Sequence, residues 1–345
     1  MAELDDFVRL AQGQGVQLNG IEPARIPGRG IGVVATRTLK PGEAILEVPM
    51  QVVRSLHSIS EAVSSQLPAG ISFHGILAAD LALDKNAYLA SWRKLLPTEK
   101  DLTASMPLLW PAELQALLPK AASDMVLLAA GQHPDVLPRD PGAGGTSLGG
   151  PAGAAPRRRP VQSCGRPGCH VAYSATEYTI TTRRQYEAGE EVFASYGNHS
   201  NDFLLAEYGF VMAENKWDSV CLDEVVMSRL TRAPKNELEA NGHAGPYMLS
   251  AESGPSRQLV AVLQKLAPSD KSSSASHDGA DTSLELGTAA KKLLKVLIGE
   301  ALENAQGIRA KILGLQAGNP AQRNMLYHRW EQIATILLQA IGRLN

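Results

Sequence analysis

The sequence predicts an α+β fold, because two strand-forming stretches flank a helical region and a second helical region follows. Residues 26–49 and 171–211 contain glycine turns and short alternations of apolar and polar residues, which are typical of strands. Residues 59–118 lie between them and are predicted to form helices. With 345 residues, 44% of them hydrophobic, the chain is large enough for two domains.

We expect the first domain to span residues 1–213, with a helical insert at 55–120, and the second to span 214–345. The second domain is predicted to be all-helical, because two long patterns near its end each place apolar residues on one helix face. The first face contains Ala290, Leu293, Leu294, Leu297, Ala301, Ala305, Ile308 and Ile312. The second contains Leu326, Trp330, Ile333, Leu337, Ala340, Ile341 and Leu344.

The composition argues against several classes of function. The formal net charge of −2 gives no basic footprint for nucleic acid, and no apolar run is long enough to span a membrane. Three cysteines are too few for a disulfide framework, which fits a reducing compartment. The acidic start at residues 1–6 lacks the features of a signal or transit peptide. We therefore expect a cytoplasmic or nuclear protein; the alternative is a chloroplast protein whose leader is missing from this sequence.

A glycine-rich stretch follows a short amphipathic helix predicted at residues 4–12. It reads Ile26-Pro27-Gly28-Arg29-Gly30-Ile31-Gly32-Val33-Val34-Ala35-Thr36, with three glycines just before a β-prone run. Such glycines indicate either a hairpin or a main chain that comes close to something bulky. They are not a dinucleotide fingerprint, because no helix follows them. A turn at 39–43 and a strand at 44–49, ended by a proline, complete this region.

Two stretches have compositions that cannot build a core. Residues 138–168 are rich in Pro, Gly, Ala and Arg, and residues 268–283 are rich in Ser and Asp, so we expect a disordered segment and a flexible linker. Cys164, Cys169 and His170 superficially offer three metal ligands. Structural zinc takes four ligands at short paired spacing, so we predict no metal site there.

The stretch from Gly189 to Phe210 carries the main functional pattern of the chain. A glycine turn leads into a short strand that ends at Tyr196. Ser200 or Asn201 can cap the helix that follows, and a second glycine turn returns Tyr208 and Phe210 toward the same neighbourhood. A strand of this kind with a buried core tyrosine would have the same local pattern.

This stretch resembles the end of the SET domain in the branch of protein methyltransferases typified by the Rubisco large-subunit lysine methyltransferases. The family pattern is GEE-hydrophobic-x-x-YG-x-x-SN-x-x-LL-x-x-YGF, and residues 189–210 contain each of its fixed elements. The run Arg29-Gly30-Ile31-Gly32 resembles the opening SET motif, whose main chain lies along S-adenosylmethionine. The family also has an Asn-His pair that holds the adenosine end of this cofactor. Between Ala121 and Val171, this sequence has only Gln132-His133 and Cys169-His170.

The resemblance implies a SET β-structure wrapped around a helical insert, followed by an all-helical domain that docks a protein substrate. It implies S-adenosylmethionine as the cofactor and Tyr196 as the catalytic residue, also in contact with the cofactor. Arg29, Gly30, Ile31, Gly32 and Phe210 would be the other cofactor-binding residues. Tyr208 would line the lysine channel, and Tyr173 is a further candidate for substrate binding. We expect a monomeric protein-lysine N-methyltransferase that acts on a non-histone protein.

The chemistry of lysine methylation explains why these residue types belong together. The transfer is a direct displacement that needs no metal. A free lysine has a pKa of about 10.4, so the reactive neutral amine is rare at neutral pH. An apolar, aromatic channel lowers that pKa, as does a neighbouring sulfonium, and a tyrosine hydroxyl can orient the amine.

Three alternatives remain open at the level of the sequence. A protein-histidine methyltransferase of the same branch would use the same motifs. A SET-fold protein-binding module that no longer catalyses is favoured by the absence of the Asn-His pair. A plain helical scaffold conflicts with the strand motifs at 28–49 and 177–197.

Overall fold

The computed structural model describes residues 2–26, 30–59, 61–67, 71, 73–83, 91–92, 94–130, 168–194, 196–267 and 286–344. The chain divides into two compact units, which we describe separately. Unit 1 comprises residues 1–102 and 138–197, and unit 2 comprises residues 103–137 and 198–345. These limits differ from the predicted domains at 1–213 and 214–345. A compact unit need not coincide with a family domain, so the domain limits stay a prediction.

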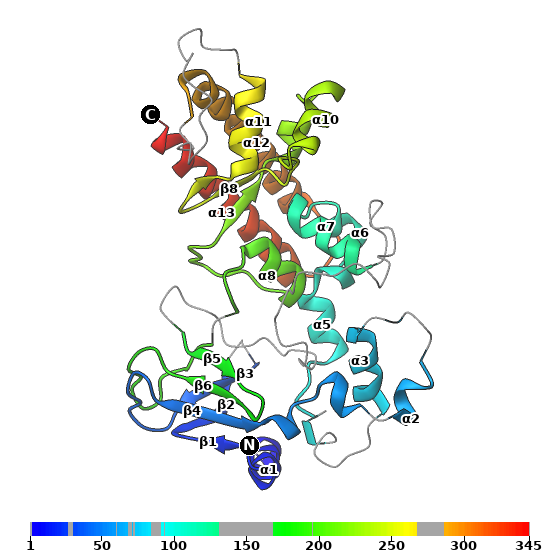
Figure 1. Ribbon diagram of the computed structural model, residues 1–345, viewed down its shortest axis with the longest axis vertical. Coiled ribbons are helices and arrows are strands. Elements are labelled where there is room, and N and C mark those ends of the chain that lie inside the picture. The colour runs from blue at the N-terminus through cyan, green and yellow to red at the C-terminus, as the bar shows by residue number, and fades with distance from the viewer. Residues whose placement is uncertain are drawn as a thin grey trace. The chain divides into compact units, whose positions relative to one another are not determined.

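Unit 1 contains the strand-rich part of the chain (Figure 1). A four-stranded sheet has the order β1-β4-β6-β5, and β2 and β3 form a separate antiparallel pair. The bounds of these strands are β1 Gln17–Leu18, β2 Ile21–Ile26, β3 Gly30–Ala35, β4 Ala44–Pro49, β5 His170–Tyr173 and β6 Glu177–Thr181. The N-terminal helix α1 (Ala2–Gly13) lies beside β1 (Figure 1), and it confirms the predicted helix.

Single bridges tie the segments of unit 1 together outside the named strands. Leu39 bridges Tyr186 and Val34 bridges Glu191, both antiparallel, while Cys169 bridges Ala194 in parallel. These contacts enclose a small apolar core, whose buried members are Ile21, Ala35, Leu39, Ile45, Cys169, Tyr186 and Val192. Segments 140 residues or more apart in sequence therefore share one core.

The predicted helical insert is divided between the two units. Within unit 1 it contributes η2 (Leu56–Ser58), α2 (Glu61–Ser64) and α3 (Phe73–Leu83), and η1 (Met50–Val52) lies just before its predicted start. Within unit 2 it contributes η3 (Pro107–Leu109) and α6 (Ala112–Gln115), and α7 (Lys120–Ala129) begins at its predicted end. The helix α5 (Glu99–Ser105) spans the residues at which the division falls.

Unit 2 is a helical assembly built on α12 (Thr288–Gly314) and α13 (Pro320–Arg343), which pack along each other (Figure 1). Both predicted amphipathic helices are confirmed, and both bury the predicted face. The other helices are α8 (Asn201–Tyr208), α9 (Asp223–Met227), α10 (Arg232–Ala240) and α11 (Arg257–Leu266). One continuous apolar core joins these helices, with Leu205, Leu297, Leu326 and Leu337 fully buried in it.

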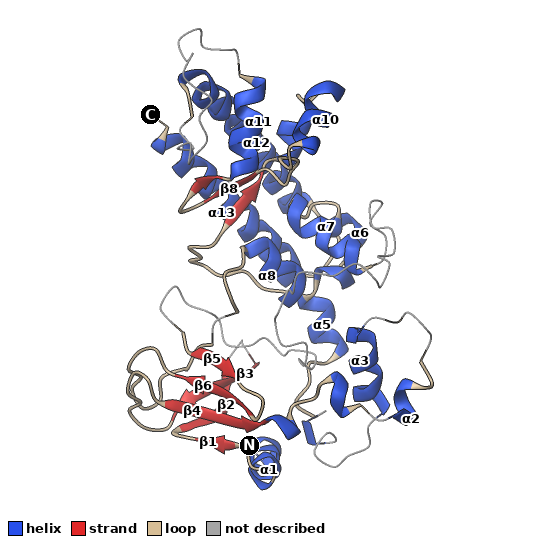
Figure 2. Cartoon of the chain, in the orientation of Figure 1, coloured by secondary structure: helices blue, strands red, loops and turns tan. Residues whose placement is uncertain are grey.

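Unit 2 also contains a small three-stranded antiparallel sheet that the sequence did not predict (Figure 2). Its strands are β7 (Ser219–Cys221), β8 (Met248–Ser250) and β9 (Gly254–Pro255). They are two or three residues long, too short for an alternating pattern to be recognised. No helix among the described residues has the length and apolar character needed to cross a bilayer.

The predicted disordered segment at 138–168 lies outside the described residues except for Gly168, and so do residues 268–283. The strand predicted at residues 44–49 is confirmed as β4. The strand predicted from residue 177 onward is β6, which ends at Thr181.

Candidate functional site

Two glycines of β3, Gly30 and Gly32, have different surroundings. Gly30 has a φ of +83°, and a Cβ atom placed there would meet no atom of the described residues within 4 Å, so these residues leave the space beside it open. A Cβ at Gly32 would lie 2.7 Å from Ile26 Cγ1 and 3.1 Å from Glu191 Oε1. Glycine is therefore required at 30 by conformation and favoured at 32 by packing. Ile31 lies between them in β3, and Arg29 is outside the described residues.

The segment that leads to Tyr196 runs beside β3. The Val192 amide donates to the Val33 carbonyl at 2.8 Å, and the Ala35 amide donates to the Glu190 carbonyl at 2.9 Å. This pairing is antiparallel, so the segment advances toward the Gly30 end of β3 as it approaches Tyr196. The structure therefore pairs the strand that follows the glycine motif at residues 29–32 with the segment that leads to Tyr196.

The other edge of the same segment pairs with the start of the strand β5. The Cys169 amide donates to the Phe193 carbonyl at 2.7 Å, and the bridge to Ala194 is parallel. Tyr196, two residues further on, is half-buried. Tyr173 lies in β5 opposite Tyr178 of β6, and 56% of its surface is exposed.

Polar side chains support the turn that precedes the tyrosine segment. Gly189 has a φ of +82°, and the Arg184 guanidinium donates to Glu190 Oε1 at 2.6 Å. The same guanidinium lies 3.8 Å from the centre of the Tyr186 ring. Burial raises the pKa of Tyr186 to about 12, and its hydroxyl lies 3.7 Å from Cys169 Sγ. Burial also raises the pKa of the Cys169 thiol, so both groups are neutral at physiological pH.

In unit 2, α8 and the turn after it carry an aromatic cluster. The ring centroids of His199 and Phe203 are 4.0 Å apart and stacked, those of Phe203 and Tyr208 are 6.1 Å apart, and those of Tyr208 and Phe210 are 6.3 Å apart. Tyr208 is half-buried, and Phe210 is 4% exposed. The turn at Gly209 thus places Tyr208 and Phe210 close together within this unit. The prediction that both return toward Tyr196, a residue of unit 1, stays a prediction.

Both ends of α8 are set by local chemistry. Ser200 is the N-cap, since its hydroxyl accepts the Phe203 amide at 3.3 Å, which decides between the two predicted caps. Gly209 ends the helix in the left-handed conformation, with a φ of 70°. A Cβ atom at Gly209 would lie only 2.5 Å from the Ser105 carbonyl oxygen, so glycine is required for space as well.

A buried ionic network, which the sequence analysis missed, joins α8 to α13. The Arg329 side chain is 0% exposed and donates through Nε to Asp202 Oδ1 and through a terminal nitrogen to Asp218 Oδ2, both at 2.6 Å. It also donates to the Ser219 carbonyl at 3.2 Å. Burial alone would lower the pKa of Arg329, but the attraction of Asp202 and Asp218 raises it above its ordinary value. The sequence did contain a sign of this network: Arg329 lies on the same apolar helix face as Leu326 and Ile333, where a charged residue is seldom buried without a partner.

An amide network lies next to this ion pair. Asn201 Nδ2 donates to the Met212 carbonyl at 2.9 Å, and Asn201 Oδ1 accepts the Met212 amide at 3.1 Å. Gln332 of α13 donates to the same Met212 carbonyl at 2.6 Å and accepts from Asn201 at 2.9 Å. Ser200 and Asn201 of the motif therefore build the helix and its return turn.

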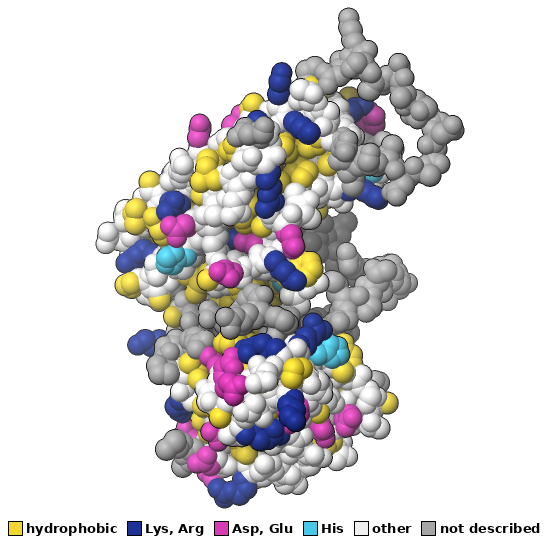
Figure 3. All heavy atoms as spheres, turned by 90° about the vertical axis from the view of Figure 1, so that its left-hand side faces the viewer, with side chains coloured by type: hydrophobic (Ala, Val, Ile, Leu, Met, Phe, Trp, Pro, Cys, Tyr) yellow, Lys and Arg dark blue, Asp and Glu magenta, His cyan; other side chains and the backbone are white. Residues whose placement is uncertain are grey.

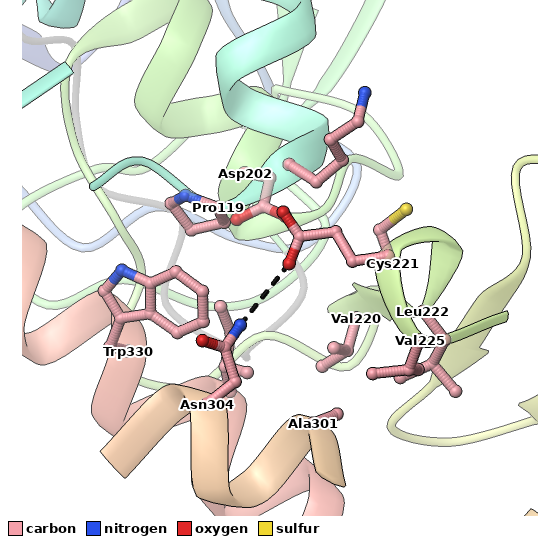
Figure 4. Close-up of a pocket in the computed structure, with 12 residues that line it drawn as sticks. Pro119, Asp202, Val220, Cys221, Leu222, Val225, Ala301, Asn304 and Trp330 are labelled. Carbon is pink, nitrogen blue, oxygen red and sulfur yellow. Dashed lines mark hydrogen bonds between the residues drawn. The ribbon is translucent and has the colours of Figure 1, made fainter. Parts of the chain in front are cut away.

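A cavity of about 30 Å³ lies in unit 2 beside Asp202 and Trp330 (Figure 4). Asn304 donates to Glu224 Oε2 at 3.3 Å in its wall. A cavity of this size has room for one or two water molecules, and a nucleoside or a lysine side chain would not fit. It is therefore a part of the helix packing.

Among the described residues, no group of three or more His, Cys, Asp or Glu side chains is arranged to hold a metal ion. Cys169 is 2% exposed and points into the core, whereas His170 is exposed. Cys164, the third ligand considered above, lies outside the described residues.

Comparison with known proteins agrees with this geometry. Residues 30–197 match the family model of the SET domain. A ribosomal lysine N-methyltransferase of Schizosaccharomyces pombe is 30% identical over 166 residues, which are 44% of this chain and 43% of that protein. Ribosomal lysine N-methyltransferase 2 of Saccharomyces cerevisiae is 58% identical over 76 residues, which are 21% of this chain and 16% of that protein. The chain thus spans less than half the length of these curated relatives.

Solved structures with the same architecture cover nearly the whole chain. A SET domain of LSMT bound to lysine and AdoHcy aligns with a TM-score of 0.59 at 16% identity, over 99% of this chain and 91% of that one. Rubisco LSMT bound to AdoMet aligns with a TM-score of 0.58 at 16% identity, over 99% and 93%. At this level of identity the likeness establishes the α+β fold. Residues 30–197 therefore carry a SET domain, and the chain shares its fold with the Rubisco LSMT structures.

Proposed function

We propose that this protein is an S-adenosylmethionine-dependent protein-lysine N-methyltransferase that acts on a non-histone protein. One observation carries the proposal: the glycine strand β3 and the segment that ends at Tyr196 pair side by side in one unit. The names of the matched relatives favour a ribosomal protein as the substrate.

The open space beside Gly30 fits a bulky cofactor laid along the main chain of β3. A side chain at position 30 would project into that space, and the positive φ disfavours any residue except glycine. S-adenosylmethionine, when bound, supplies a methyl group on a positively charged sulfur. We assign its binding to Arg29, Gly30, Ile31, Gly32, Tyr196 and Phe210.

Tyr196 is the proposed catalytic residue because its hydroxyl can orient the lysine amine. Tyr208 lines the proposed lysine channel, where aromatic walls disfavour the ammonium form and lower the pKa of the substrate lysine. Correct alignment of the reacting atoms can supply about 7–11 kcal/mol of the barrier reduction. Tyr173, exposed in β5, is a proposed contact for the protein substrate.

The helical C-terminal region is the proposed docking surface for the protein substrate, and we propose a monomer in the cytoplasm or nucleus. On the face shown in Figure 3, basic and acidic side chains are interspersed, with no large field of one sign. Such a surface favours a protein partner over nucleic acid, which is bound through clustered positive charge.

Transfer of a labelled methyl group from S-adenosylmethionine to recombinant, unmethylated ribosomal proteins tests the proposal. We expect labelled lysine in the product, and we expect Tyr196→Phe to abolish most of the transfer while leaving the fold intact. Tyr327→Phe, which removes a hydroxyl that accepts from Arg309 in unit 2, is the matched control. Full turnover by Tyr196→Phe would remove this residue from the mechanism.

A second candidate, a SET-fold protein-binding module without catalysis, is favoured by one observation. Cys169 has a thiol where the family's Asn-His pair has a side-chain amide, and this thiol is buried in the core toward Tyr186, so the Cys169-His170 pair cannot replace that pair at the cofactor. A wild-type protein that binds ribosomal proteins but transfers no methyl group would support this candidate.

A further inference from the structure

We infer that Arg329 and Gln332 of α13 are positioning residues for Tyr208 and Phe210. The inference rests on the proposed methyltransferase function and adds a role for the last helix of the chain in the chemistry itself. Both side chains contact the segment 201–212, which carries the aromatic pair, and they contact it at its two ends.

Arg329 holds the beginning of this segment. Its bond to Asp202 fixes the first turn of α8, and its bond to Asp218 fixes the chain just before β7. Both carboxylates are almost fully buried, at 1% and 4% exposure, so no water can replace the guanidinium. Arginine suits this position because its planar fork can serve two carboxylates at once.

Gln332 holds the end of the segment. Its amide donates to the carbonyl of Met212, two residues after Phe210, and accepts from Asn201 at the start of α8. One turn of α13 thus bonds to both ends of the loop that α8 and its return turn form. The Arg329 guanidinium lies 3.4 Å from the Gln332 oxygen, which joins the two contacts into one network.

The segment between these two ends has little freedom of its own. The Gly209 amide donates to the Leu205 carbonyl at 3.0 Å, and the Phe210 amide lies 3.4 Å from the Leu204 carbonyl. Leu204 and Leu205 are 2% and 0% exposed. A displacement of either end would therefore be transmitted to Tyr208 and Phe210 with little local relaxation.

Stability alone does not explain why this contact is polar. Apolar side chains of similar volume stabilise a buried contact at least as well as a buried ion pair does. Hydrogen bonds have a defined distance and direction, which apolar packing lacks. The bond from Gln332 therefore fixes the position of one backbone carbonyl, that of Met212. A network of this kind suits a segment whose aromatic rings must keep one orientation.

The test compares Gln332→Met with wild type. This variant conserves volume and removes all three polar contacts of the amide, those with Met212, Asn201 and Arg329. Gln339→Met on the exposed face of the same helix is the matched control. We would measure transfer from saturating S-adenosylmethionine to recombinant, unmethylated ribosomal proteins, the affinity for S-adenosylmethionine by calorimetry, and the melting curve. Gln332→Glu, which keeps an acceptor for Asn201 and Arg329, is examined in the same way in case the first variant folds poorly.

We expect kcat to fall about tenfold in both Gln332 variants. A small displacement of Tyr208 can raise the activation barrier by the corresponding amount, because the rate depends on the alignment of the reacting groups. The KM for the ribosomal proteins and the Gln339→Met variant should be unchanged. A kcat equal to that of wild type in a folded Gln332 variant would overturn the inference alone. A wild-type protein without transfer would instead overturn the proposed function, and the inference with it.

Discussion

Two segments with functional motifs are held in place by different means. In unit 1, residues 189–194 are fixed mainly by backbone hydrogen bonds to β3 on one edge and to Cys169 on the other. In unit 2, residues 201–212 are fixed by side chains: Arg329, Gln332 and Asn201. Backbone pairing depends little on residue type, whereas the side-chain network depends on a few particular residues.

The comparison shows where each segment is sensitive to substitution. We expect the first segment to tolerate side-chain changes that keep the strand and its small core. The second segment fails when one buried charge loses its partner, because an uncompensated buried carboxylate is far more costly than a lost surface contact.

Arg329→Met should lower the free energy of unfolding by about 3–5 kcal/mol, because Asp202 and Asp218 would remain buried without a cation. Chemical denaturation monitored by circular dichroism measures the change. Arg343→Met, on the exposed last turn of the same helix, should cost less than about 1 kcal/mol. Equal effects of the two substitutions would show that the network is unimportant for stability.

Gly209→Ala and Gly189→Ala compare the two segments directly. Both glycines have positive φ, but a Cβ at Gly189 meets open space and one at Gly209 would lie 2.5 Å from the Ser105 carbonyl oxygen. Gly189→Ala should cost about 1–2 kcal/mol from backbone strain alone. Gly209→Ala should cost clearly more, since strain and the contact with a backbone atom add. Denaturation midpoints of the two variants measure the difference, and the reverse order would contradict the account.

Tyr186→Phe tests the side-chain contribution in unit 1. It removes a hydroxyl 3.7 Å from Cys169 Sγ while the ring stays packed, so we expect a loss of only about 0.5–1 kcal/mol. A loss above about 3 kcal/mol, the size expected for breaking a buried ion pair, would mean that unit 1 also depends on a polar side-chain network.

The smallest effect should come from His199, which stacks on Phe203. Burial lowers the pKa of His199 below its usual value of about 6.5, against the opposing attraction of Glu207. The unfolded chain therefore binds the proton first as the pH falls through about 6.5, and stability decreases over that range. In His199→Phe this part of the pH dependence should be missing from thermal melts between pH 7.5 and pH 5. An unchanged pH dependence would contradict the assignment.

The sequence was most informative where the determinants are local. Glycine turns at Gly189 and Gly209 and the amphipathic faces of α12 and α13 each depend on neighbouring residues, and each was predicted. The helix cap was predicted at Ser200 or Asn201, and it is Ser200. Arg329 was missed because its partners Asp202 and Asp218 lie more than 100 residues away in sequence. The strands β7–β9 were missed because short strands carry no recognisable period.

Family resemblance supplied what local reasoning could not. Nothing in composition or periodicity indicates that residues 33–35 pair with residues 190–192, because this pairing closes a loop of more than 150 residues. The roles of Tyr196, Tyr208 and Tyr173 likewise rest on the resemblance, and they remain proposals to be tested by mutation.

The most direct test of the central claim is calorimetric titration of the purified protein with S-adenosylmethionine. We predict saturable binding at a single site, weakened when Gly30 is replaced by valine, since that side chain would fill the space beside β3. Gly42→Val, at a turn that also has a positive φ and open space, controls for backbone strain. Absence of binding at millimolar S-adenosylmethionine in the folded wild-type protein would contradict the claim.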